Sequence, residues 1–162
     1  MVNKLKDIKL FLTDVDGVLT DNGVYYGAEG EVLKRFSIRD GMAVERLLAM
    51  GVETGIITGE ASPSVAKRAE KLKIKEVHLY VKDKATKFLE ILASKQLDAS
   101  QVAYMGDDVN DLEIMQLVGI KACPNDAMKC IVDICDYVCE NKGGHGAFRE
   151  FAEMIIASKE LK

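Results

Sequence analysis

The stretch IKLFLTDVDG, residues Ile8–Gly17, contains a short apolar run that ends in two aspartates and a glycine. Two later runs have the same design: VETGII (52–57) leads into Thr58, and VAYM (102–105) leads into a Gly-Asp-Asp sequence. Short, nearly continuous apolar runs that are bounded by turn residues indicate strands buried on both faces of a parallel sheet. The opening stretch therefore predicts the first strand of an α/β fold.

The carboxyl ends of these three strands are expected to converge, because ligands of parallel sheets bind outside those ends. Convergence would bring Asp14, Asp16, Thr58 and Asp107 to one place. Crowded carboxylates repel one another, so a divalent cation is the simplest reason to gather them. Oxygen-only ligands suit Mg²⁺. The sequence therefore predicts a magnesium site at this edge of the sheet.

Strand-like and helix-like segments alternate along the rest of the chain. The expected elements are a hairpin over 23–36, helices over 40–50, 62–72, 83–96, 126–134 and 147–158, a further helix after Asp108, and short strands over 76–80 and 119–122. Asp40 is expected to cap the helix that starts there. The alternation predicts a single doubly wound, Rossmann-like α/β domain over residues 1–162, with the hairpin as a flap and no room for a cap domain.

Composition excludes several classes of function. The net charge is −4 and no run of Lys or Arg exceeds two residues, which argues against nucleic-acid binding. The first residues are typical neither of a signal peptide nor of a membrane span, so we expect a cytoplasmic protein without membrane contact. The cysteines form no CxxC pair and are expected to be small buried hydrophobes, with a metal or redox role as the alternative. They are Cys123, Cys130, Cys135 and Cys139.

Asp14 and Asp16 lie two residues apart at a strand end, and this spacing lets both side chains point the same way. One carboxylate can attack phosphorus as a nucleophile. The other can protonate the leaving oxygen and then activate the water that cleaves the aspartyl phosphate. Gly17 would let the chain turn sharply beside them. The alternative for this motif alone is an Asx turn after a strand.

Three further motifs fit the same chemistry. Thr58-Gly59 offers a hydroxyl and a backbone N–H to phosphate oxygens. Lys84 is expected at the start of a helix, where a cation opposes the helix dipole and where phosphate binding would explain it. Gly106–Asp111 holds three acids, which indicates metal binding with supporting carboxylates. The alternative for Thr58-Gly59 is a strand-end turn, for Lys84 a solvated surface lysine, and for Gly106–Asp111 a helix cap.

Taken in chain order, Asp-x-Asp-Gly, Thr-Gly, Lys and Gly-Asp-Asp-x-x-Asp resemble the four motifs of the haloacid-dehalogenase superfamily of phosphotransferases. The resemblance covers the whole chain. It implies Asp14 as the nucleophile and Asp16 as the acid and base, and Thr58 and Lys84 as phosphate ligands. The magnesium ligands that it implies are Asp14, the Asp16 carbonyl and Asp107, supported by Asp108 or Asp111.

Longer stretches are similar to the lidless subgroup that acts on 3-deoxy-2-ulosonic acid phosphates. They are DVDGVLTDNG (14–23), the Tyr-Tyr hairpin, RDGM (39–42) and NKGGHGAFRE (141–150). Members hydrolyse 3-deoxy-manno-octulosonate 8-phosphate or KDN 9-phosphate, a nononate, on routes to lipopolysaccharide or sialic-acid-type sugars. They form homotetramers in which the hairpin and the glycine-rich tail cover a neighbouring active site. The resemblance implies the same arrangement here, with a small sugar-acid phosphate as the substrate.

The resemblance leaves the two substrates open. Arg68 matches the family arginine that pairs with the sugar carboxylate. Glu60 and Lys71 match the nononate pattern, and because a longer polyol needs more hydrogen-bonding groups, we expect the nononate to be the substrate. The sequence SIRDG (37–41) instead favours the octulosonate. Glu60 and Lys71 have a simpler alternative as exposed helix charges.

Other functions fit the motifs less well. A phospho-accepting receiver domain places its acceptor aspartate on a middle strand, whereas here the aspartate pair comes first. A catalytically idle scaffold would lack one of the motif residues, and none is missing. A phosphomutase would need a lid that excludes water. A phosphatase for another sugar phosphate is the alternative within the family.

Overall fold

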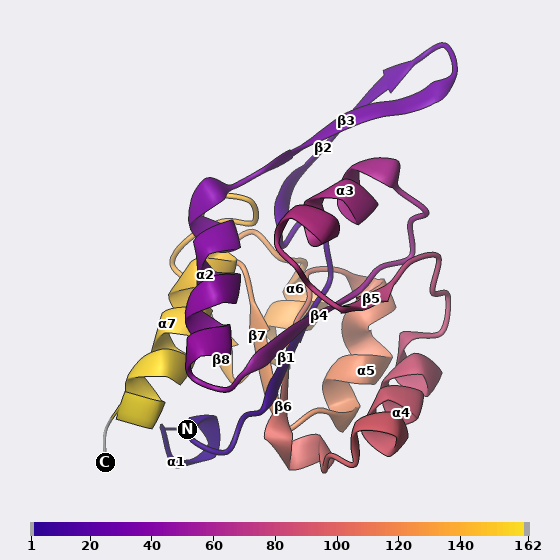
Figure 1. Cartoon of the computed structure of the whole chain (residues 1–162). Helices are drawn as coiled ribbons and strands as arrows, with labels where there is room; N and C mark the ends of the chain where they lie inside the picture. Colours follow the sequence, from indigo (N-terminus) through magenta and orange to yellow (C-terminus); the bar gives the residue numbers. More distant parts are fainter. Residues whose placement is uncertain (1, 161–162) are drawn as a thin grey trace.

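The computed structural model describes residues 2–160, and a parallel sheet forms its centre (Figure 1). Within these residues the sheet has six strands in the order β5-β4-β1-β6-β7-β8, and every neighbouring pair is parallel. The strands are β1 (Leu10–Thr13), β4 (Glu53–Ile57), β5 (Glu76–His78), β6 (Val102–Met105), β7 (Ile120–Cys123) and β8 (Tyr137–Val138). The predicted doubly wound α/β fold is confirmed.

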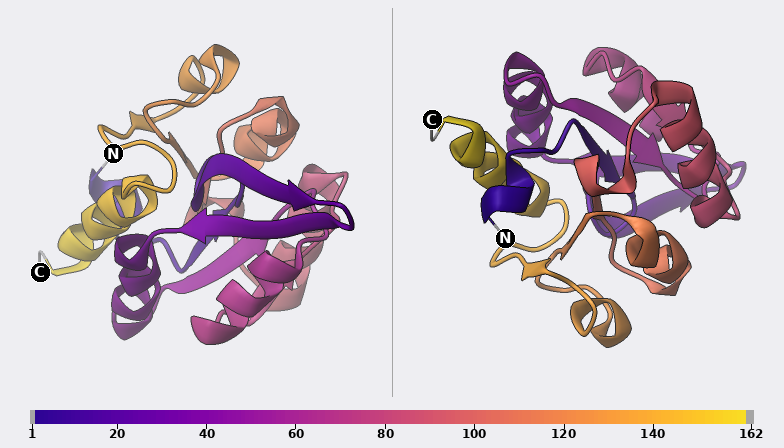
Figure 2. Two further views of the ribbon diagram at one scale, coloured as in Figure 1. Left: turned by 90° about the horizontal axis from the view of Figure 1, so that it is seen from above. Right: turned by 90° about the horizontal axis from the view of Figure 1, so that it is seen from below.

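Helices cover both faces of the sheet (Figure 2). One face carries α1 (Val2–Leu5), α2 (Ile38–Ala49), α3 (Pro63–Lys71) and α7 (Ala147–Glu160), and the other carries α4 (Lys84–Lys95), α5 (Leu112–Leu117) and α6 (Lys129–Val132). Short 3₁₀ turns lie at η1 (Ala99–Gln101) and η2 (Val109–Asp111). Within residues 2–160, no helix combines the length and the apolar character needed to cross a membrane.

The apolar run of β1 is continuous because both of its faces are buried. Phe11 packs into the core on the α7 side, where its ring stacks on Phe148 with centroids 4.6 Å apart. Leu10 and Leu12 point to the opposite core, under α4 and α5. All three side chains are fully buried. Alternation of side chains across the sheet therefore ties β1 to both helical layers.

β1 is also the point at which the order of the strands reverses. The chain leaves β1 first towards β4 and β5, then crosses to β6 on the other side. Thr13 pairs with both Ile56 and Met105, so the residues that follow all three strands emerge together. Such a switch point opens a crevice at the carboxyl ends of the strands, where ligands bind in doubly wound sheets.

The predicted flap is an antiparallel hairpin of β2 (Thr20–Gly27) and β3 (Gly30–Phe36), inserted between β1 and α2. It starts three residues earlier than expected and projects beyond the sheet (Figure 1). Large apolar side chains on it are exposed, among them Tyr25, Val32 and Leu33. Among the described residues the hairpin is the only strand pair outside the central sheet, and no cap domain is present.

Some local expectations were wrong. Ser37, not Asp40, caps α2: its hydroxyl accepts the Asp40 N–H at 3.3 Å. Asp40 is instead buried, and its carboxylate accepts the backbone N–H of Arg149 at 2.9 Å. The short elements α1 and β8 were not expected, and α6 is shorter than the predicted helix.

All four cysteine thiols are free. Cys123 and Cys139 are buried in the two halves of the core, and the other two pack against its edge. Cys123 and Cys139 are therefore buried as expected, whereas Cys130 and Cys135 are only half-buried.

Candidate active site

The loop after β1 carries the first acidic group. Asp14 is 4% exposed, and its Oδ1 accepts the backbone N–H of Val15 at 2.7 Å. Gly17 follows with a φ of +83°, a conformation that favours glycine. A Cβ atom at this position would lie 1.9 Å from Oδ2 of Asp107. Glycine therefore lets the loop after β1 approach the acidic loop after β6.

Lys84 forms ion pairs with residues of both loops. It is the first residue of α4, is 3% exposed, and places its Nζ 3.1 Å from Oδ2 of Asp14. The same ammonium donates to Oδ1 of Asp111 at 2.7 Å. That oxygen also accepts the Tyr104 hydroxyl at 2.6 Å, while Oδ2 accepts the N–H of Asp107 at 2.9 Å. Asp111 thus orients Lys84 and the loop after β6.

Negative charge exceeds positive charge in this buried cluster. Oxygens of Asp14, Asp107 and Asp111 lie within 4.8 Å of one another, against one ammonium from Lys84. Burial, and then Asp111, raise the pKa of Asp14 to about 8 and that of Asp107 to about 7. Burial opposes the charge of Lys84, but Asp14 and Asp111 raise its pKa.

The cluster fits a divalent cation. Its donors are all oxygens, and a dication would balance the excess charge. Both oxygens of Asp111 already accept hydrogen bonds, so Asp14 and Asp107 are the carboxylates best placed to hold the ion. Asn22 of β2 donates to Oδ2 of Asp107 at 3.3 Å and adds to the orientation of that ligand.

Asp16 lies in a different environment, at the wall of the cleft. Its side chain is 24% exposed, and both oxygens accept the Lys34 ammonium, at 2.7 and 2.8 Å. The cleft has a volume of about 280 Å³ and lies above the cluster. The predicted residues that line it are Asp14, Asp16, Thr58, Gly59, Glu60, Asp107 and Asp108. Lys84 and Asp111 lie buried beneath this lining.

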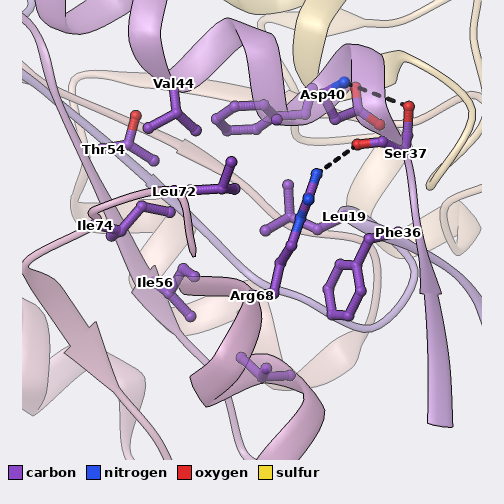
Figure 3. Close-up of a pocket in the computed structure, with 13 residues that line it drawn as sticks. Leu19, Phe36, Ser37, Asp40, Val44, Thr54, Ile56, Arg68, Leu72 and Ile74 are labelled. Atoms are coloured by element: carbon purple, nitrogen blue, oxygen red, sulfur yellow. Dashed lines mark hydrogen bonds between the residues drawn. The ribbon is translucent and has the colours of Figure 1, made fainter. Parts of the chain in front are cut away.

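Two predicted substrate-binding residues lie outside the cleft of their own chain. Arg68 points towards the base of the hairpin, where its Nη2 donates to the carbonyl of Ser37 at 2.8 Å and its guanidinium lies over Phe36 (Figure 3). Lys71 is exposed and lines another cleft, between α2 and β5. The reason is that α3 leads away from the carboxyl edge of the sheet, which places Lys71 roughly 12 Å along the helix from Pro63.

Sequence reasoning missed three polar residues at the site: Asn22, Lys34 and Tyr104. The first two come from the hairpin, whose alternation gives no sign that one lysine is buried. Tyr104 lies within an apolar strand and looked like a core residue. Its hydroxyl reaches Asp111 only because β6 and the turn after it bring the two side chains together.

Known proteins share this sequence pattern. Residues 76–151 match the haloacid dehalogenase-like hydrolase family. The 3-deoxy-D-manno-octulosonate 8-phosphate phosphatase of Yersinia pestis is 35% identical over 160 residues, which are 99% of this chain and 86% of that protein. The protein of the same name from Haemophilus influenzae is 36% identical and covers 98% of this chain and 88% of its own length.

The chain belongs to the haloacid dehalogenase-like hydrolases. A solved structure of this hydrolase family agrees closely with the fold: the 3-deoxy-D-manno-octulosonate 8-phosphate phosphatase of Moraxella catarrhalis, in complex with magnesium, phosphate and KDO. It has a TM-score of 0.94 and 34% identity, over 98% of this chain and 91% of that one. Membership in a hydrolase family decides against a receiver domain, and the chain is a phosphoric monoester hydrolase.

Proposed function

We propose that this hydrolase removes the phosphate of 3-deoxy-D-manno-octulosonate 8-phosphate in a Mg²⁺-dependent reaction. The observation that carries the proposal is the buried cluster at the base of the cleft, in which Lys84 contacts Asp14 and Asp111 while Asp107 lies beside them. A nucleophile, a cation for phosphate and an oxygen-only metal site are then within reach of one phosphoryl group.

The residues that would hold Mg²⁺ are Asp14, Asp107 and the backbone carbonyl of Asp16, with Asp111 and Asp108 in support. When bound, the ion supplies the positive charge that offsets repulsion between the phosphate and Asp14. Thr58, Gly59 and Lys84 bind the remaining phosphate oxygens through a hydroxyl, a backbone N–H and an ammonium.

Two steps complete the reaction. An oxygen of Asp14 bonds to phosphorus while the bond to the sugar oxygen breaks, and Asp16 gives its proton to that oxygen. Asp16, now a carboxylate, takes a proton from water as the water oxygen bonds to phosphorus. The bond between Asp14 and phosphorus breaks, and inorganic phosphate leaves.

The choice of the eight-carbon substrate is supported by the named relatives, which are octulosonate 8-phosphate phosphatases. Glu60, which favours the nononate, does line the cleft, but Lys71 lies elsewhere in the same chain. Arg68 and Lys71 would therefore have to act on the site of a neighbouring subunit if they bind the sugar.

We also infer a cytoplasmic homotetramer. The exposed apolar residues at the hairpin tip support burial against another subunit. The glycine-rich tail packs on the loop after β1 of its own chain, where the Gly144 N–H donates to the carbonyl of Val18 at 2.9 Å. In the proposed assembly the tail supports that loop and also borders the neighbouring site.

Phosphate release from the octulosonate 8-phosphate and from KDN 9-phosphate, measured side by side, tests the proposal. We expect a higher kcat/KM for the octulosonate, complete loss of activity in excess chelator and full return with Mg²⁺. A preference for the nine-carbon ester would change the substrate but not the class of reaction. Full activity in chelator would overturn the metal-dependent scheme.

A further inference from the structure

We propose that Lys34 is a positioning residue that holds the Asp16 carboxylate in the orientation for proton transfer, so that the hairpin of a subunit takes part in the chemistry of its own site. The inference rests on the proposed function, in which Asp16 is the acid and base. It assigns a task to a residue that none of the four sequence motifs contains.

The contact between Lys34 and Asp16 is close and shielded. Nζ lies 2.7 and 2.8 Å from the two carboxylate oxygens, and the Lys34 side chain is 1% exposed. Among the described residues that line the cleft, Lys34 is the only cation, whereas six are acidic. A lysine in such a position is a specific partner rather than a solvated surface charge.

A second set of contacts fixes Lys34 itself. Glu31 lies three residues before Lys34 on β3 and places its Oε2 3.6 Å from the ammonium. The other oxygen of Glu31 accepts the Ser62 hydroxyl at 2.5 Å, and that hydroxyl also caps α3. The hairpin is thus tied to the start of α3 on one side and to Asp16 on the other.

Asp16 depends on this arrangement for its orientation. Among the described residues, the ammonium of Lys34 is the only group that hydrogen-bonds its carboxylate. The Asp16 side chain lies at the cleft wall and is 24% exposed. Proton transfer requires a heavy-atom separation within hydrogen-bond reach, so a freely rotating Asp16 side chain would be a poor acid when protonated and a poor base when ionised.

The test compares two esters that differ in their need for an acid. The sugar 8-phosphate has an alkoxide leaving group that must be protonated, whereas 4-nitrophenyl phosphate has a leaving group that departs without a proton. The ratio kcat/KM reports the steps up to departure of that group. Lys34→Met should lower kcat/KM for the sugar phosphate by roughly 10- to 100-fold and that for 4-nitrophenyl phosphate by less than about 3-fold.

Matched variants separate this role from others. Lys67→Met removes an 82% exposed lysine whose ion pair is with Glu70 on the same helix, and both esters should react as with the wild type. Lys34→Gln, which still offers one N–H to Asp16, should lie between the wild type and Lys34→Met. It carries the test if Lys34→Met does not fold, as judged by circular dichroism.

Three results would overturn the inference. Equal losses for both esters would mean that Lys34 only supports the fold. A rise in KM for the sugar phosphate at unchanged kcat would mean that Lys34 binds the sugar acid. A wild-type protein that hydrolyses neither ester would overturn the proposed function as well, and this result is distinct because it requires no variant.

Discussion

The residues of the acidic cluster are held in an arrangement that is unfavourable without a cation. Asp14 and Asp107 are buried beside Asp111, and hydrogen bonds from Val15 and Asn22 fix their orientation. Preorganised groups of this kind cost free energy when no cation is bound, because like charges are kept close together where they are poorly solvated. Two measurements test these residues: the pH dependence of stability and the activity of variants.

The first measurement is stability against pH in excess chelator. The pKa values of Asp14 (about 8) and Asp107 (about 7) lie above the ordinary 3.8, so between about pH 4 and 8 the folded protein keeps protons that the unfolded chain releases. The free energy of unfolding should therefore fall as pH rises through this window, by up to about 1.4 kcal/mol per pH unit for each retained proton.

Urea titrations at pH 5 and pH 8 check this slope. Asp14→Asn removes one of the two groups and should flatten the decline, and Mg²⁺ should restore stability most at the higher pH. A metal-free protein that becomes more stable between these pH values would contradict the assignment of raised pKa values.

The second measurement is activity. Asp14→Asn should lose at least roughly 1000-fold in kcat, because an amide cannot form the covalent bond to phosphorus. Its fold should be intact, since the change removes a crowded charge and keeps the shape of the side chain. Asp16→Asn should fail as well, through loss of proton transfer. Retention of a tenth of the wild-type rate by Asp14→Asn would refute its role.

Individual site residues could be predicted from the sequence where a residue type is chemically unusual for its position. Acids directly after apolar strands pointed to Asp14 and Asp107, and the structure brings them together. Lys34 carried no such signal, because a lysine within a hairpin is ordinarily solvated and its burial depends on how the hairpin folds over the loop after β1. Arg68 and Lys71 remain predictions: both lie outside the cleft of their own chain, so a role in sugar binding depends on a neighbouring subunit, which motif spacing does not describe.

At the scale of elements, the packing of α7 on β1 holds the centre of the sheet. Phe148 is fully buried and stacks on Phe11. Phe148→Ala should therefore lower the free energy of unfolding by about 3–5 kcal/mol. Leu89→Ala on α4 is the matched control, because Leu89 is 54% exposed and should cost less than about 0.5 kcal/mol. Thermal or urea denaturation of both variants checks the difference.

Long elements with clear periodicity were predictable, and short ones were not. The strands β1 and β6 are apolar over most of their length, β4 ends in two isoleucines, and α2, α4 and α7 each show one apolar face. β8 has two residues and α1 has four, too few for any period to appear. Such elements exist because their neighbours offer hydrogen bonds and apolar surface, which a local pattern does not reveal.

At the scale of the whole molecule, the hairpin tip is the feature that a single subunit leaves unexplained. Val32 and Leu33 are 62% and 46% exposed. If the tip is buried in the proposed tetramer, Val32→Ser with Leu33→Ser should shift the assembly towards smaller species. Light scattering during size-exclusion chromatography measures this shift, with Leu89→Ala as the control. An unchanged mass would contradict burial of the tip, and a monomeric wild type would contradict the tetramer.

The position of β1 between β4 and β6 also has a consequence for kinetics. Leu10 pairs with Glu53 on one side and with Val102 on the other, so the strand that leads into Asp14 cannot complete its pairing until residues far along the chain reach it. Contacts of such long range slow folding. After dilution from denaturant, the helical circular dichroism signal should therefore recover before phosphatase activity. The delay between the two should reflect the time that β6 needs to pair with β1.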